Sequence, residues 1–448
     1  MLCSCDSSHE EAPTPVQIFR ISVDSQWKTD GYQSWVFIAD EEGVSSEAYA
    51  VANDTTITIE LPPSYKPDEH LSFNLFGFWQ NDDKGLERDY SMVTFTNVKP
   101  GDYNLIYFFP ESTDGKESTY RLSIGNVPDM PSHSFGVFGK NVRGLLTNYY
   151  AGAIEFQTWF TGEKTDITCY DAAFGECRYV TVKDAPPGQS TAVNYEDMIP
   201  MENAITYHLA KPAMIDVTTY GVDNHDFAHS TKLTSMKTSS PADELKFYYP
   251  QDRFDDHETH IIVVDPETRV SKSYAKIGQV PTSFKLWTGV VTQPKVDGRN
   301  LTTSMTTPAS LLQTISSSEK RDEAGHVKCR WAVNQPGNTE STIKLPILPA
   351  SLASLNPGWS KQDLKFDEIY VIEMGGPAAY DKFVRSQLQL ESREDPGQWT
   401  FFSDGEFSTH FQSSDPAAIG GRTRYKDLSD FANPRALLHQ VGDRNSSK

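Results

Sequence analysis

Hydrophobic and polar residues alternate along many short stretches of this chain. The clearest stretches are Phe19–Val23, Thr56–Leu61, Thr119–Ile124 and Thr342–Leu345. A period of two places the apolar side chains on one face of an extended strand, so each stretch predicts a half-buried β-strand. Turn-forming residues separate the stretches, as at Asp40–Gly43, Asn81–Gly85, Asp114–Gly115 and Asp265–Glu267. Frequent short strands with such turns favour an all-β fold of tandem antiparallel β-sandwiches over a parallel sheet with crossover helices.

An internal repeat divides the chain. The motif Val93–Gly101 recurs 87 residues later as Val180–Gly188, and Tyr120–Leu122 recurs at the same spacing as Tyr207–Leu209. This aromatic–basic–aliphatic triplet also occurs at Phe19–Ile21 and Phe284–Leu286, and it predicts the opening strand of each of four units.

The expected units are sandwiches of the immunoglobulin or fibronectin type III kind, with a larger one at the end. We expect a disordered leader over residues 1–15, sandwiches over 16–117, 118–204 and 205–281, and a larger β-rich domain over 282–448. A segment from Pro377 to Leu390 fits either a helix or a strand, because its apolar residues match both periods. A short terminal helix is predicted after Asn433-Pro434, ending at Gly442.

Composition excludes some classes of protein. The formal net charge is −21 and the sequence pI about 4.9, so the surface repels phosphate backbones and no nucleic acid partner is expected. The longest apolar strings, Leu105–Phe109 and Ile261–Val264, fall far short of the roughly 18 residues that span a bilayer.

The first residues, Leu2-Cys3-Ser4-Cys5 followed by a polar acidic leader, resemble the lipobox of a bacterial lipoprotein. The resemblance implies that Cys5 is the acylated first residue of the mature protein and that Met1 is a shortened start. The alternative is an unmodified, cysteine-containing disordered leader.

Together with the tandem sandwiches, this start resembles cell-envelope lipoproteins of the Bacteroidota type, for which no family function is established. The resemblance implies a lipid-anchored protein of the cell envelope, on the outer membrane and facing outward. The plan also looks like that of outer-surface glycan-binding lipoproteins, although no motif supports this sharper likeness.

The remaining cysteines suggest one cross-link. Cys169 and Cys177 bracket a seven-residue segment, and this length predicts a disulfide across a hairpin in an oxidising compartment. Cys329 lies in an alternating run and is expected to be a small buried core residue.

No recognised catalytic motif occurs. The chain contains no Gly-x-Ser-x-Gly elbow, no His-Glu-x-x-His helix and no paired Cys-x-x-Cys motifs. A pair of glycosidase carboxylates is defined by its separation in space, so the sequence alone does not address it.

Histidines gather in the third unit, where five of the eleven fall within residues 208–260. With nearby carboxylates they suggest a zinc site, or calcium held by carboxylates, built from His225, His229, His257, His260 and Asp255. Solvated surface loops are the alternative. His257 and His260 are three residues apart, so on a strand they would point to opposite faces.

Aromatic residues are the other candidates for a ligand site. Trp35, Trp159, Trp287 and Trp331 lie inside alternating stretches and are expected in the core, whereas Trp27, Trp79, Trp359 and Trp399 neighbour polar or turn residues and are the candidates for exposed tryptophans. Exposed aromatic faces stack on sugar rings, so we predict a ligand platform from Tyr149, Tyr150, Trp359 and Trp399.

The sequence therefore predicts a non-enzymatic, surface-exposed lipoprotein that acts as a binding, adhesion or display module for an extracellular glycan or protein. One alternative is a glycan-binding accessory protein of a polysaccharide-uptake system. A hydrolase with its site in the C-terminal region and a structural subunit of an envelope complex are further alternatives.

Overall fold

The computed structural model consists almost entirely of β-strands, as the alternating sequence predicts. It describes residues 17–25, 27, 32–61, 65, 70–81, 87–106, 117–128, 135–139, 142–161, 164–173, 176–222, 231–238, 240–249, 254–268, 270–322, 325–355, 364–374, 379–388 and 406–413. No helix in these ranges is long and apolar enough to cross a membrane.

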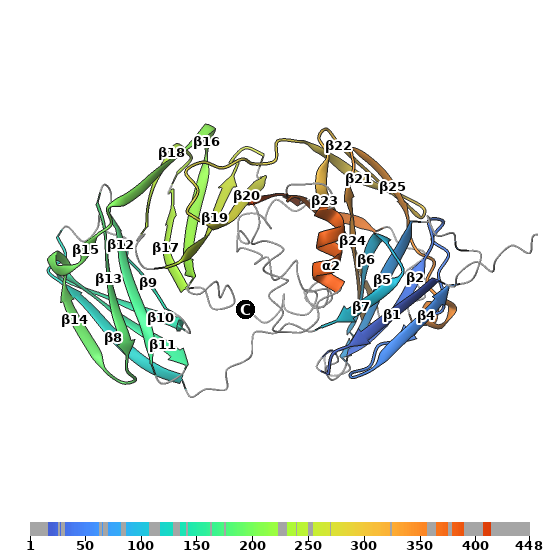
Figure 1. Ribbon diagram of the computed structural model, residues 1–448, viewed down its shortest axis with the longest axis horizontal. Coiled ribbons are helices and arrows are strands. Elements are labelled where there is room, and N and C mark those ends of the chain that lie inside the picture. Colours follow the sequence, from blue (N-terminus) through green and yellow to red (C-terminus); the bar gives the residue numbers. More distant parts are fainter. Residues whose placement is uncertain are drawn as a thin grey trace, which may run out of the picture.

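A 13-stranded sheet runs across the molecule, with the second sandwich at one end and the blue N-terminal strands at the other (Figure 1). Its order is β17 (Thr231–Lys237), β16 (Asn203–Val222), β19 (Asp256–Val264), β20 (Ser271–Gly278), β27 (Glu406–Ser413), β26 (Lys365–Glu373), β23 (Ala309–Asp322), β24 (Gly325–Gly337), β6 (Glu87–Val98), β5 (Leu71–Asn81), β2 (Tyr32–Ala39) and β3 (Tyr49–Ala50), with β18 (Ala242–Tyr249) beside β16.

This sheet crosses the boundaries that the repeats predict. β6 from the first expected unit pairs in parallel with β24 from the last, in register from Glu87 opposite His326 to Phe95 opposite Asn334. β20 of the third expected unit also crosses a boundary, because it pairs antiparallel with β27 of the last unit. Residues 16–117 and 282–448 thus share one sheet and one core instead of following one another as separate sandwiches.

The reason lies in the burial of β6. Seven consecutive residues, Tyr90–Thr96, are buried, whereas a strand of a one-sided sandwich buries alternate residues. One face of this part of the sheet is covered by the sheet β4 (Thr56–Leu61), β1 (Gln17–Val23), β7 (Gly101–Leu105) and by the helix α2 (Ala379–Leu388). The other face is covered by the sheet β21 (Val291–Asp297), β22 (Asn300–Met305), β25 (Glu340–Lys344) and by the short helix α1 (Ala350–Ala353).

Helix α2 resolves the ambiguous segment after Pro377 in favour of a helix. Its buried residues recur at helical spacing on one face: Ala379, Tyr380, Phe383, Val384, Gln387 and Leu388. The predicted helix at residues 433–442 lies outside the described residues.

The second sandwich has two four-stranded sheets of its own. One is β10 (Val142–Tyr150), β11 (Ala153–Thr161), β8 (Glu117–Gly125), β14 (Ser190–Asn194). The other is β15 (Ile199–Pro200), β13 (Glu176–Ala185), β12 (Thr165–Ala173), β9 (Phe135–Phe138), and the 3₁₀ turn η2 (Tyr195–Asp197) follows β14. The second sheet also packs on the third segment, where the Tyr170 hydroxyl donates to the Ser235 carbonyl at 2.7 Å.

The two copies of the 87-residue repeat lie at equivalent places in the fold, where the chain passes from one layer of a sandwich to the other. Asn97 and Asp184 occupy matching positions of the repeat and both have a positive φ, 55° and 49°. After each of them the chain passes to the other layer and adds an edge strand parallel to an opening strand, β7 beside β1 and β14 beside β8. The sheets are therefore mixed and not purely antiparallel as predicted.

The opening-strand prediction fails at the fourth triplet. Phe284–Leu286 lies outside any strand, because Phe284 packs edge-on against Tyr207 in the core of the third segment.

The predicted disulfide is not formed, and Cys169 and Cys177 are free thiols. Cys169 lies opposite Val180 and Cys177 opposite Ala172, so the two cysteines are not cross-strand neighbours. Their side chains enter different cores on the two faces of the sheet. Burial raises the pKa of the Cys177 thiol to about 12. Cys329 is buried, as expected.

Candidate functional site

Strand β10 carries the densest group of exposed apolar side chains among the described residues. Leu145 is 44% exposed, Leu146 48%, Tyr149 71% and Tyr150 57%. Only five other large hydrophobic side chains of the described chain are exposed, and no two of them share a strand. We call the free side of β10, with these four residues, the β10 edge.

The apolar residues occupy both faces of the strand. Leu145 and Tyr149 lie opposite the fully buried Thr158 and Ile154 of β11, so they extend the core-facing side of the sheet. Leu146 lies opposite Gln157 and Tyr150 opposite Ala153, on the outer side. The described residues of the second sandwich therefore leave its core open along this edge.

Among the strands that the structure describes, β10 pairs on one side only, with β11. An end strand presents a row of unpaired backbone N–H and C=O groups, which is a template for another strand.

Several of the other end strands have features that discourage pairing. β3 and β15 have two residues each and β9 has four. β21 contains Pro294, β17 contains two lysines, and β25 has a charged residue at each end. β4 alternates regularly, with its polar residues outward. β10 has nine residues and no proline; its one charged residue, Arg143, and its one register shift, between Val142 and Gly144, lie at the start of the strand, and the stretch from Leu145 to Tyr150 has neither feature.

The structure describes only two of the four residues of the predicted ligand platform. Tyr149 and Tyr150 are exposed, but as consecutive residues of a strand they point to opposite faces and so do not form one stacking surface. Trp359 and Trp399 lie outside the described residues.

The predicted metal ligands are also described only in part. His225 and His229 lie outside the described residues, and Asp255 immediately precedes β19. His257 lies edge-on to Tyr249, whereas His260 is on the opposite face, with Nε2 2.6 Å from Oε1 of Glu258. Within the described ranges, no group of three or more His, Cys, Asp or Glu side chains could hold a metal ion.

Sequence reasoning missed Leu145 and Leu146, and it misplaced Trp27. Trp27 is fully buried and donates its indole N–H to the Ser34 hydroxyl at 3.1 Å. The signal for β10 was present in the pairs Leu145-Leu146 and Tyr149-Tyr150, because doubled apolar residues cannot all face one core in a strand.

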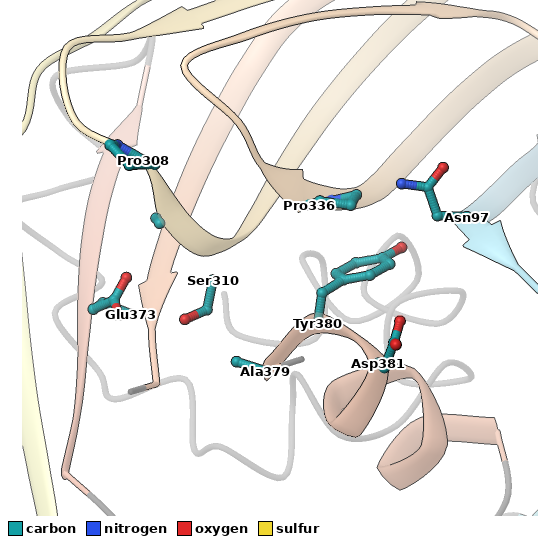
Figure 2. A pocket seen from close by; sticks show the side chains of 9 residues that line it. Asn97, Pro308, Ser310, Pro336, Glu373, Ala379, Tyr380 and Asp381 are labelled. Carbon is teal, nitrogen blue, oxygen red and sulfur yellow. The ribbon is translucent and has the colours of Figure 1, made fainter. Parts of the chain in front are cut away.

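A shallow cavity of about 410 Å³ lies where α2 meets the large sheet. Figure 2 shows Tyr380, Asp381 and Glu373 around it. The Tyr380 hydroxyl is engaged by the Thr96 and Asn334 carbonyls at 2.7 and 2.8 Å, and the Ser310 hydroxyl accepts the Met374 N–H at 3.0 Å. The Tyr380 hydrogen bonds join α2 to the sheet, and the Ser310–Met374 hydrogen bond joins β23 to the end of β26, so these polar groups serve the packing of the helix and the strands around the cavity.

No protein-family model matches this chain, and no curated protein does either. Among solved structures, the fimbrial anchor protein Mfa2 from Porphyromonas gingivalis is similar at 7% identity with a TM-score of 0.15, covering 52% of this chain and 100% of that one. The C-terminal globular domain of an oligosaccharyltransferase from Pyrococcus abyssi is similar at 11% identity with a TM-score of 0.12, covering 50% and 48%. The chain is thus a mostly β-sheet protein with a distant likeness to a fimbrial anchor, and likenesses at this level assign neither family nor function.

Proposed function

We propose that the protein is a non-enzymatic binding or adhesion protein of the cell surface, which holds a protein partner by strand addition to the β10 edge. The observation that carries this proposal is the nine-residue, proline-free end strand with four exposed apolar side chains.

Strand addition matches the chemistry of this edge. An added strand satisfies the free backbone groups of β10, each bond adding about 0.5–1.5 kcal/mol net, while side-chain contacts select the sequence. Side chains of the added strand would contact Leu145 and Tyr149 on the core side and Leu146 and Tyr150 on the outer side, and each would lose part of its exposure.

A labelled synthetic peptide with the sequence of Val142–Tyr150 tests strand capture, because this sequence can pair antiparallel with β10. A scrambled peptide of the same composition is the comparison. We expect saturable binding of the native-order peptide to the dilute full chain in fluorescence polarisation. The variant L145K/L146K should lose at least about tenfold in affinity, because lysines on an edge oppose pairing.

The matched control is S190K/A192K, which adds the same charge to exposed positions of β14, the other end strand of the same sheet. Equal binding of native and scrambled peptides, or equal loss in both double variants, would contradict strand capture at β10.

Anchoring at Cys5 is part of the proposal and rests on the lipobox-like start, which lies outside the described residues. Intact-mass analysis of protein made in a bacterial host from its full native start is expected to show an acylated chain beginning at Cys5. An unmodified chain that retains Met1 would rule out the anchor.

A further inference from the structure

We propose that the partner of the β10 edge is a second copy of this chain, with two β10 strands paired antiparallel about a twofold axis. The two four-stranded sheets would then form one sheet of eight strands. This inference rests on the proposed function, because it names the partner of the same edge.

The two-faced apolar pattern favours such a partner. An isolated peptide strand would pair with the backbone of β10 but would cover the exposed apolar side chains on the two faces only in part, because it brings no second layer. A second copy brings a two-layered sandwich with the same open core, so Leu145 and Tyr149 of both copies would close one continuous core.

The sequence of β10 is complementary to itself in one register. A twofold axis perpendicular to the sheet keeps each residue on its own face, so only residues of equal parity can lie opposite one another. Centred on Thr147, the pairing places Leu145 opposite Tyr149 of the partner subunit and Tyr150 opposite Gly144 of the partner subunit. An aromatic ring across from a glycine is a favourable cross-strand pair, and Gly144 already has Trp159 opposite it on β11.

Charge also permits this pairing. Arg143 is the one charged residue of β10, and in this register the two copies of position 143 are eight residues apart, roughly 27 Å. The net charge of −21 on each chain opposes association at long range, and salt screens that repulsion. The dimer should therefore become more stable as ionic strength rises, the reverse of an interface held by ion pairs.

Sedimentation velocity of the full chain from roughly 1 to 100 µM tests the dimer. We expect a reversible monomer–dimer equilibrium that strengthens with salt, that L145K/L146K weakens at least about tenfold, and that S190K/A192K leaves unchanged. A chain that stays monomeric throughout, or a dimer insensitive to L145K/L146K, overturns the inference.

Register is tested by cross-linking Thr147→Cys in a chain whose Cys3 and Cys5 are replaced by serine. Only residue 147 faces its own copy, at a Cα separation of about 4.5–5.5 Å that permits a disulfide. Oxidation should give a covalent dimer from Thr147→Cys and not from Ser190→Cys. Peptide capture by a chain that remains monomeric would retain the proposed function and reject self-pairing, whereas loss of both would reject the two together.

Discussion

Replacing Trp331 by alanine is expected to lower the free energy of unfolding by about 3–5 kcal/mol. Trp331 is 1% exposed in β24, and its indole N–H donates to the Thr94 hydroxyl of β6 at 2.9 Å. The substitution leaves a large cavity at the parallel junction between residues 16–117 and 282–448. It also removes the hydrogen bond that spans the junction.

The smaller change Thr94→Val tests the polar part alone. The Thr94 hydroxyl accepts from Trp331 and donates to Oδ1 of Asn74 at 2.8 Å, so valine leaves two buried groups without this partner. We expect a loss of about 1–3 kcal/mol.

Urea denaturation followed by tryptophan fluorescence and by far-UV circular dichroism measures both variants. Val290→Ala is the control, because Val290 is 62% exposed and its truncation should stay within about 0.5 kcal/mol. A Trp331→Ala chain as stable as the control would show that the junction contributes little.

Acidification is expected to destabilise the protein through His410. This imidazole is 5% exposed in β27, and neither ring nitrogen has a hydrogen-bond partner among the residues that the structure describes. Burial, and secondarily the nearby Lys272 of β20, lower the pKa of His410 from 6.5 to about 4. The ring of Trp287 lies edge-on to the His410 imidazole, with 5.2 Å between ring centroids. On the neighbouring strands, Val371 of β26 and Lys272 of β20 lie opposite His410. Of these three neighbours, only Lys272 is charged.

The sign follows from proton binding. Between pH 6.5 and about 4 the unfolded chain binds a proton at His410 that the folded chain does not, so stability is lost as the pH falls through this window. The full loss is on the order of 3 kcal/mol.

The test compares wild type with His410→Phe, and with His410→Gln should the first variant fold poorly. Chemical denaturation at about pH 7, 5.5 and 4.5 is expected to show a smaller loss of stability in the variants than in the wild type. Carboxylates that titrate in the same range are common to all three chains. Parallel losses in wild type and variants would exclude His410 as the cause.

Local pattern predicted the features that depend on near neighbours in sequence. Alternation placed strands at Phe19–Val23, Thr56–Leu61 and Thr119–Ile124, because a period of two buries one face of a strand wherever that strand lies. The 87-residue repeat predicted a recurring strand and turn, and the positive φ of Asn97 and Asp184 explains why short polar residues stand there.

The candidate site was half visible in the sequence. The tip at Tyr149-Tyr150 was recognised as exposed, but the edge position of β10 was not, because a strand is an edge only when no other strand lies beside it. The arrangement of the whole sandwich decides that absence; within the nine residues, the doubled apolar pairs indicate only that both faces of the strand are apolar.

By itself the sequence determined the all-β class, the positions of the regularly alternating strands and the acidic surface, since each follows from local composition and period. The tertiary structure alone decided which strands are neighbours: β6 beside β24, Cys169 and Cys177 in different cores, and Phe284 outside a strand. The physical reason is that strand pairing is chosen by the burial of both faces over the whole chain. A half-buried strand has the same period of two beside any partner.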